Sequence, residues 1–358
     1  MVKFLTVILI IILGSVNFFW NSLVEKIGPL VKPEAPKKEI SLYQNQNNSE
    51  VKATELPLAH LSLENIEPTM ANIMSTLLAS ASQGASPNFL PIRDWSVEEP
   101  PIEAKAALIL MVDSLESSEL NQDKILYQKN IGEVLPIASL TKLMTASIIL
   151  ENMDLEQVAT VSQKAVSAYG EMGNLSVGEK ISVKNLLYAL LLESSNDAAV
   201  ALAENFNSGT APASAGTASE FVSLMNQKAK ELGLKNTAFT DPTGFETTNI
   251  STALNLAKLV KHTLKQPLIY EILRTPSIDL ASADGLINHH FTNTNQLLSR
   301  LPNIVGGKTG YTEEANSCMI LVTKSPKGDY LISIVLGAQD KFQETEKLVR
   351  WAEEAYLW

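Results

Sequence analysis

The sequence predicts an α+β fold in which one antiparallel, five-stranded sheet is assembled from both ends of a domain spanning residues 101–358. Two strand-like runs, AALILMVD from Ala106 and KILYQKN from Lys124, stand at the front of this domain. Three more, GGKTGYT, SCMILVTKS and YLISIVLGAQ, stand near its end with short polar connections. A helical middle separates the two groups. We therefore expect helices to flank the sheet and to form an all-helical subdomain beside it.

Residues 1–24 contain a nearly continuous apolar run, FLTVILIIILGSVNFFW, from Phe4 to Trp20. A run of about 17 residues reaches the lower limit for a helix that spans a bilayer. A signal peptide has a similar composition but ends at a small-x-small cleavage site, and none stands out between Gly14 and Ser22. The prediction is an uncleaved, single-pass membrane anchor, with signal cleavage and a secreted or periplasmic protein as the alternative. In both cases the rest of the chain is expected on the extracytoplasmic side.

Residues 25–100 are rich in Pro, Asn, Gln, Ser and Glu, as in KPEAPKKEISLYQNQNNSEVK. Such a segment buries too little apolar surface to offset the conformational entropy that ordering it would cost. We predict a mostly disordered tether between the apolar segment and the folded domain. The stretch NSGTAPASAGTAS, residues 207–219, has a similar low complexity and is predicted to be a linker without chemistry.

The helical middle begins after Pro136, where apolar residues recur at helical spacing and Ser139 is expected in the N-cap region. The next helical pattern is interrupted at SSND, which places Ser194 and Asn196 on a tight loop between two helices. Further helices are predicted at residues 182–193, 198–205, 251–264, 267–273 and 341–358. The last of these is amphipathic and is expected to cover the sheet.

Charge and cysteine content exclude some classes of function. The chain has 358 residues and a formal net charge of −11, and it carries no basic stripe, so no nucleic-acid partner is expected. Cys318 is the only cysteine, which rules out a disulfide within the chain and favours a buried thiol. The adjacent His289 and His290 are expected to be a surface pair, and neither a metal nor a cofactor is predicted.

Ser139 and Lys142 stand three positions apart at the start of an apolar helical run, IASLTKLM. Side chains three apart share one face of a helix, so the hydroxyl and the amine would be neighbours. A desolvated lysine amine can lose its proton and activate a serine hydroxyl, and backbone N–H groups at a helix start can stabilise an oxyanion. Taken alone, the pair is also compatible with a plain N-cap serine, and the same spacing recurs at Ser49-x-x-Lys52 in the predicted tether.

Two further motifs strengthen the catalytic interpretation. Lys308-Thr309-Gly310 lies in a predicted strand behind two glycines, where another backbone can approach closely. Ser194-x-Asn196 lies on the loop between two helices, and by itself it would indicate only a turn stabilised by its own side chains.

Serine-x-x-lysine, serine-x-asparagine and lysine-threonine-glycine in this order resemble the penicillin-recognising serine enzymes. The segments ASLTKLMTA, SSNDAA and GGKTGYT, with NTNQLL at 293–298 and DPTGF at 241–245, are most similar to low-molecular-mass penicillin-binding proteins that act as D-alanyl-D-alanine carboxypeptidases. This resemblance implies a β-lactamase/transpeptidase-like fold. It also implies a peptidoglycan stem peptide ending in D-Ala-D-Ala as substrate and β-lactam antibiotics as covalent inhibitors.

The resemblance also implies a role for each matching residue. Ser139 would attack the carbonyl between the two D-alanines, Lys142 would take its proton, and Ser194 would relay a proton to the leaving amine. The substrate-binding residues would be Asn196, Lys308, Thr309, Gly310 and Tyr311. Within this set, Asn196 would hold Lys142 and the substrate amide, and Lys308 with Thr309 would bind the terminal carboxylate. The backbone N–H groups of Ser139 and Tyr311 would form the oxyanion hole.

Three departures from the family pattern bear on this expectation. Ser195 stands where glycine is more common, and Val305 stands where an aspartate commonly precedes the lysine-threonine-glycine strand. Many family members also continue into a small β-rich domain and a C-terminal amphipathic membrane anchor. The N-terminal apolar segment is expected to replace that anchor.

Three other functions share these motifs or this fold. D,D-endopeptidase action on cross-links would use the same site. A class A β-lactamase would need a deacylating glutamate, and no Glu-x-x-Leu-Asn follows Asn196. The third alternative is a catalytically inactive, membrane-tethered peptidoglycan-binding protein. A triad hydrolase is disfavoured because no Gly-x-Ser-x-Gly is present.

Overall fold

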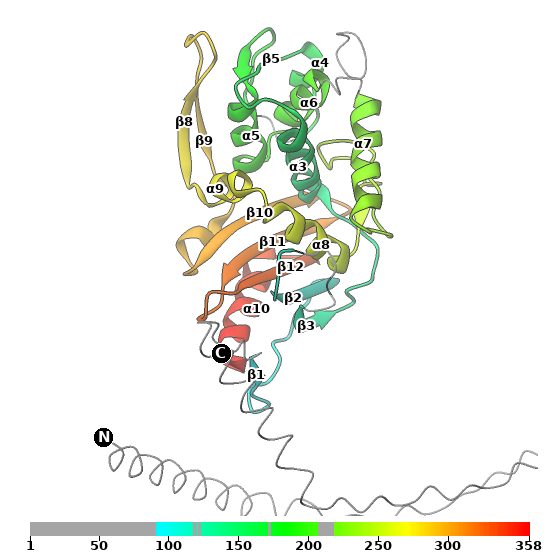
Figure 1. Cartoon of the computed structure of the whole chain (residues 1–358), viewed down its shortest axis with the longest axis vertical. Helices are drawn as coiled ribbons and strands as arrows, with labels where there is room; N and C mark the ends of the chain where they lie inside the picture. Colours follow the sequence, from blue (N-terminus) through cyan, green and yellow to red (C-terminus); the bar gives the residue numbers. More distant parts are fainter. Residues whose placement is uncertain (1–90, 117–119, 121–122, 171–172, 207–217) are drawn as a thin grey trace, which may run out of the picture. The chain divides into compact units, whose positions relative to one another are not determined.

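A five-stranded antiparallel sheet with the order β10-β11-β12-β2-β3 forms the centre of the molecule (Figure 1). The computed structural model describes residues 91–116, 120, 123–170, 173–206 and 218–358. The strands of the sheet are β2 (Ala106–Val112), β3 (Lys124–Lys129), β10 (Ile304–Thr312), β11 (Asn316–Lys324) and β12 (Tyr330–Ala338). The prediction of one antiparallel sheet built from both ends of the domain is confirmed.

Strand β2 joins the two groups of strands and is buried on both faces. Its residues pair with β12 from Ala106 opposite Leu336 to Val112 opposite Tyr330. Every second residue of β2, beginning with Ala106, packs against the helices of the middle segment, and the others, such as Ile109, pack under α10 (Lys341–Ala355). Burial on both faces explains why AALILMV is a continuous apolar run rather than an alternating one.

The helical part lies on the face of the sheet opposite α10 (Figure 1). Its helices are η3 (Ala138–Thr141), α3 (Lys142–Asn152), α4 (Gln163–Val166), α5 (Val183–Leu192), α6 (Asn196–Asn205), α7 (Ala218–Glu231), α8 (Ala253–Thr263), α9 (Pro267–Arg274) and η4 (Gln296–Ser299). Short strand pairs accompany them. These pairs are β4 (Leu135–Pro136) with β7 (Ile250–Ser251), β5 (Val158–Thr160) with β6 (Lys180–Ser182), and β8 (Ser277–Ala281) with β9 (Asn288–Thr292).

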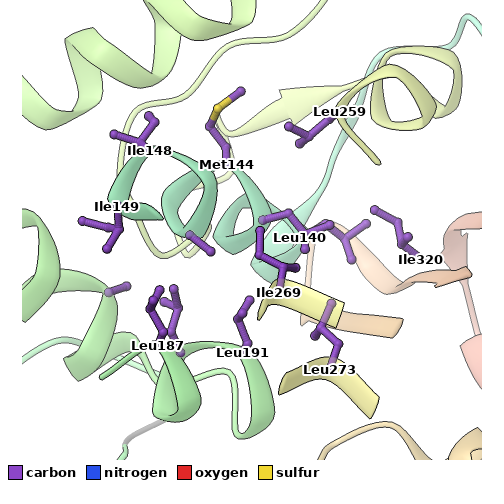
Figure 2. Close-up of a cluster of buried hydrophobic side chains, with 14 of the residues drawn as sticks. Leu140, Met144, Ile148, Ile149, Leu187, Leu191, Leu259, Ile269, Leu273 and Ile320 are labelled. Carbon is purple, nitrogen blue, oxygen red and sulfur yellow. The ribbon is translucent and has the colours of Figure 1, made fainter. Parts of the chain in front are cut away.

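One hydrophobic core connects the helices to the sheet and fixes the start of α3. Figure 2 shows the side chains of Leu140, Ile269 and Ile320 converging from η3, α9 and β11, and all three belong to the same buried cluster. Leu140 and Ile269 are completely buried. Burying one such side chain stabilises the fold by about 1.5–3 kcal/mol. This packing holds the 3₁₀ turn that carries Ser139 against the sheet.

The last residues of the chain do not continue the closing helix. Helix α10 ends at Ala355, and β13 (Tyr356–Leu357) pairs with β1 (Ile92–Arg93). The prediction of a helix up to Trp358 is therefore wrong at its end. Arg93, which comes before the domain start predicted at residue 101, lies over the rings of Trp351 and Tyr356.

The predicted anchor and most of the predicted tether lie outside the described residues, as do residues 207–217 of the predicted linker. The end of that linker was placed wrongly, since α7 begins at Ala218. Among the residues that the structure describes, no helix has both the length and the apolar character needed to cross a bilayer.

Candidate active site

Ser139, which was expected in the N-cap region, lies in the 3₁₀ turn η3 that directly precedes α3. The N-cap position of α3 belongs to Thr141, whose side chain makes no capping hydrogen bond. Ala138, directly before Ser139, has a φ of +47°, and a Cβ on Gly244 would lie 2.0 Å from the Ala138 carbonyl oxygen. Close contact with the loop at Gly244 thus holds the serine in a turn that the local sequence would not adopt alone.

The Lys142 side-chain nitrogen lies at the centre of the site. Its Nζ lies 2.8 Å from Ser139 Oγ, 2.7 Å from Asn196 Oδ1 and 2.7 Å from the Thr243 carbonyl oxygen. The whole side chain is buried. Burying a lysine nitrogen is costly unless hydrogen bonds replace its hydration, and these three contacts do so. The serine–lysine contact expected from the spacing is therefore present, and Asn196 holds the lysine as the resemblance implied.

A second lysine contacts the second serine. Lys308 Nζ donates to Ser194 Oγ over 2.8 Å and to the Thr309 carbonyl oxygen over 2.9 Å. Ser194 has a φ of +66° and lies between α5 and α6, while Asn196 is the first residue of α6 rather than a loop residue. Because Asn196 follows Ser194 by two residues, the start of α6 joins the Ser139–Lys142 pair to the Ser194–Lys308 pair. All three motifs converge on one site.

Strand β10 approaches Ser139 at Gly310. A Cβ on this residue would lie 3.1 Å from the Ser139 backbone nitrogen and 3.2 Å from the Ile137 carbonyl oxygen, so a larger residue here would require η3 to shift by a few tenths of an ångström. Tyr311 follows in the same strand with its ring exposed, and Thr309 Oγ1 lies 2.7 Å from Thr294 Oγ1. The residues of the lysine-threonine-glycine motif therefore line the site opposite α6.

The turn at residues 241–246 contributes a site group to which the sequence analysis assigned no role. Asp241 Oδ1 accepts the backbone N–H groups of Thr243 and Gly244 at 2.6 and 2.8 Å, and its Oδ2 accepts that of Glu246 at 2.9 Å. These bonds orient the Thr243 carbonyl oxygen toward Lys142. The Asp-Pro-x-Gly pattern within DPTGF was a visible turn signal, but nothing local indicated which group the turn would face.

The two departures near the motifs have structural consequences. Ser195 caps α6, since its Oγ accepts the Ala198 N–H over 3.0 Å. The carboxyl of the next acidic residue, Asp197, has its pKa raised by burial, and hydrogen bonds from the backbone at Gly173 and Leu175 act against this shift. Val305 packs at the edge of the hydrophobic core, on the part of β10 before Lys308.

The remaining polar candidates lie outside this site. Burial raises the pKa of the Cys318 thiol to about 11, which agrees with the expected buried cysteine. His289 is buried and its Nε2 lies 2.6 Å from Glu179 Oε1, so the prediction of a surface pair is wrong for His289 and right only for His290. Glu179 lies 110 residues before His289 in the sequence, so no local pattern predicted their contact.

Comparison with known proteins agrees with this geometry. A family model described as D-alanyl-D-alanine carboxypeptidase matches residues 94–340. The chain belongs to this family. The match spans the sheet, the helical part and all three motifs, so the resemblance noted from the motifs is confirmed.

Relatives of known name in this family differ in the activity that their names give. A D-alanyl-D-alanine endopeptidase of Pseudomonas aeruginosa is 34% identical over 268 residues, which is 72% of this chain and 83% of that protein. The D-alanyl-D-alanine carboxypeptidase DacF of Bacillus subtilis is 35% identical over 261 residues, 71% of this chain and 62% of that protein.

Solved structures from this family share the fold. The Streptomyces K15 DD-transpeptidase superposes with a TM-score of 0.63 at 28% identity and covers 72% of this chain and 99% of its own. A D-alanyl-D-alanine carboxypeptidase of Mycobacterium tuberculosis H37Rv gives the same TM-score at 26% identity, covering 72% and 94%. The α+β, transpeptidase-like fold is therefore established.

Proposed function

We propose that the chain is a serine-type D-alanyl-D-alanine carboxypeptidase that removes the terminal D-alanine from peptidoglycan stem peptides through an acyl-enzyme on Ser139. The contact of Lys142 Nζ with Ser139 Oγ, inside a buried set of acceptors, is the observation that carries this proposal. Family membership supplies the substrate class.

The partners of Lys142 explain how it would act as a base. A neutral amine has two N–H groups and one lone pair, and the Asn196 Oδ1 and Thr243 carbonyl oxygens accept the two N–H groups. The lone pair then points at Ser139 Oγ and accepts its proton. The serine oxygen attacks the carbonyl carbon, and the backbone N–H groups of Ser139 and Tyr311 hold the developing oxyanion.

Collapse of the tetrahedral intermediate breaks the C–N bond and leaves the acyl group on Ser139. The departing amine needs a proton, and Ser194, which accepts a hydrogen bond from Lys308, would relay to it the proton that Lys142 took from Ser139. Water then hydrolyses the ester and releases the shortened peptide. The Lys308 ammonium and the Thr309 hydroxyl would hold the substrate's terminal carboxylate. Gly310, which has no side chain, lets β10 lie close to the turn that carries Ser139.

Two measurements test this function together. Purified protein is incubated with a D-Ala-D-Ala stem peptide, with the release of D-alanine as the expected result, and separately with a penicillin. We expect the penicillin adduct to persist for many minutes, because the glutamate that deacylates class A β-lactamases has no counterpart here. Recovery of the unmodified mass within seconds would favour a β-lactamase, and the absence of any adduct would favour an inactive binding protein.

Endopeptidase action on cross-links is the second candidate, because the relative from Pseudomonas aeruginosa bears that name. The same nucleophile would then cleave a D-alanyl bond whose amine belongs to a neighbouring stem peptide. Cross-linked and uncross-linked muropeptides, compared at equal concentration by product mass, distinguish the two activities. Faster loss of the cross-linked dimer would favour the endopeptidase.

Lys308→Ala is expected to reduce kcat/KM more for a peptide with a free terminal carboxylate than for the same peptide amidated there. A hydrogen bond to a charged group contributes about 1.5–3 kcal/mol, so the difference should be about ten- to a hundredfold. The measurement is kcat/KM on the matched peptide pair. Equal losses for both peptides would show that Lys308 acts only through Ser194.

We also propose that the N-terminal apolar segment anchors the protein in the cell membrane with the catalytic domain on the extracytoplasmic side. Phe4–Trp20 is the longest apolar run in the sequence. Deleting residues 1–30 is expected to move the protein from the membrane pellet to the soluble fraction while activity on a short D-Ala-D-Ala peptide remains. A truncated protein that still sediments with membranes would point to another anchor, with α10 as the first candidate.

A further inference from the structure

Two threonine hydroxyls meet on the side of the site where the substrate's terminal carboxylate would bind. Thr309 Oγ1, in the lysine-threonine-glycine motif of β10, lies 2.7 Å from Thr294 Oγ1. Only 5% of Thr309 is exposed, so bulk water contributes little to the hydrogen bonding of its hydroxyl. Thr294 follows β9, lies outside the three motifs, and has no part in the proposed mechanism described above.

The backbone around Thr294 is fixed from two sides. The Thr294 N–H group donates to the Leu192 carbonyl oxygen over 3.0 Å, at the end of α5. The side chain of the preceding residue, Asn293, donates through Nδ2 to the carbonyl oxygens of Leu273 and Thr275 over 3.0 and 2.9 Å, at the end of α9. The Thr294 side chain is therefore held between the ends of two helices and lies next to β10.

The number of hydrogens limits how the two hydroxyls can be used. A threonine hydroxyl has one hydrogen to donate and two lone pairs that accept. An ionised carboxylate only accepts, so the Thr309 hydroxyl can bind it only by donating this single hydrogen. The contact between the two threonines must then have Thr294 as donor and Thr309 as acceptor. If Thr309 donates to Thr294 instead, its hydrogen points away from the substrate.

We propose that Thr294 is a positioning residue, which donates its hydroxyl hydrogen to Thr309 and so directs the Thr309 hydrogen at the substrate's terminal carboxylate. This inference rests on the proposed function and adds to it the residue that orients one of the carboxylate-binding groups. The bond from Thr294 also polarises the Thr309 hydroxyl and makes it a better donor, because consecutive hydrogen bonds strengthen each other where water is excluded. An amidated terminus can donate its own N–H group to Thr309, so its binding depends less on Thr294.

The test uses the full chain in detergent and one D-Ala-D-Ala stem peptide in two forms, with a free or an amidated terminal carboxylate. The measured quantity is the ratio of kcat/KM for the free form to kcat/KM for the amidated form. Thr294→Val keeps the shape of the side chain and removes its hydroxyl. We expect this variant to lower the ratio by about three- to tenfold, the size of one net hydrogen bond. Thr294→Ser, which keeps the hydroxyl, should preserve the ratio.

Thr248→Val is the matched control, because the hydroxyl oxygens of Thr248 and Thr240 form a similar pair, 2.8 Å apart, on the exposed surface. It should leave both the ratio and the activity unchanged.

A ratio that stays the same or rises in Thr294→Val overturns the inference. This includes an equal loss on both peptides, which would mean that Thr294 only supports the fold. A loss of preference in Thr294→Ser as large as in Thr294→Val also overturns it, because the hydroxyl would then not be the group that acts. An unaltered chain that cleaves both peptides equally well would overturn the inference and leave the proposed function intact. Cleavage of neither peptide by the unaltered chain would instead overturn the proposed function, and the role of Thr294 with it.

Discussion

Replacing Ser139 by alanine is expected to abolish both the covalent penicillin adduct and the release of D-alanine. The serine hydroxyl is the one that Lys142 contacts, at 2.8 Å, and β10 approaches its backbone nitrogen at Gly310. Removing a catalytic nucleophile typically lowers kcat by several powers of ten. Intact-mass measurement after incubation with a penicillin, and D-alanine release from a stem peptide, provide the two readouts.

Ser49→Ala is the matched control for this experiment. Ser49 and Lys52 repeat the serine-x-x-lysine spacing in a part of the chain that lies outside the described residues. The Ser49 variant should acquire the same adduct as the unaltered protein, mapping to the peptide that contains Ser139. An adduct that persists in Ser139→Ala would show that the nucleophile has been assigned wrongly.

Lys142→Arg is expected to be as inactive as Lys142→Ala at neutral pH, although it keeps the positive charge. A guanidinium group stays protonated and offers no lone pair, so it cannot take the proton from Ser139. A positioned general base typically raises the rate of a reaction by about a hundred- to ten-thousandfold. The rate of acylation by Lys142→Arg is therefore expected to fall by at least that much. The rate of penicillin acylation is the direct measurement.

Lys164→Arg is the control for replacing a lysine by an arginine at a position away from the site. Its side chain is 67% exposed and lies in a surface ion pair with Glu204, so acylation should proceed at the rate of the unaltered protein. Thermal unfolding of both variants separates loss of folding from loss of chemistry. Acylation by a folded Lys142→Arg variant at a rate near that of the unaltered protein would mean that charge, and not proton transfer, is what Lys142 provides.

The central sheet and most of the longer helices followed from the sequence because their signals are local, but α7 was not predicted. Continuous or alternating apolar runs predict strands, and apolar residues at helical spacing predict α8 and α9. The hairpin of β8 and β9 was missed because its alternating pattern is short and weak: β8 has only Ile278 and Leu280 as alternating apolar residues, and in β9 the polar His289 takes one of the two buried positions. The two-residue strands β1 and β13 were missed because each exists only through pairing with the other end of the domain.

For the site too, local motifs could be predicted from the sequence, whereas contacts between distant segments could not. The motifs identified Ser139, Lys142 and Asn196, and the structure brings their side chains together. The Thr243 carbonyl oxygen was not predicted, because any residue can supply a carbonyl and only the tertiary fold decides where it points. Ser139 lies at the start of the helical segment as expected, but the 3₁₀ turn that carries it, packed against the loop at Gly244, was not predicted.

The pairing of β2 with β12 has a consequence for folding. Residues from opposite ends of the domain, such as Val112 and Tyr330, lie side by side in the finished sheet. Bringing together two segments so far apart in the sequence costs conformational entropy before the strand pairing contributes any stability. Domains rich in such distant contacts therefore fold slowly. The strand that carries Lys308 lies in the same late-synthesised group as β12. A partly synthesised chain holding only Ser139 and Lys142 has no complete site, so activity is expected to arise only once the last strands have emerged and paired.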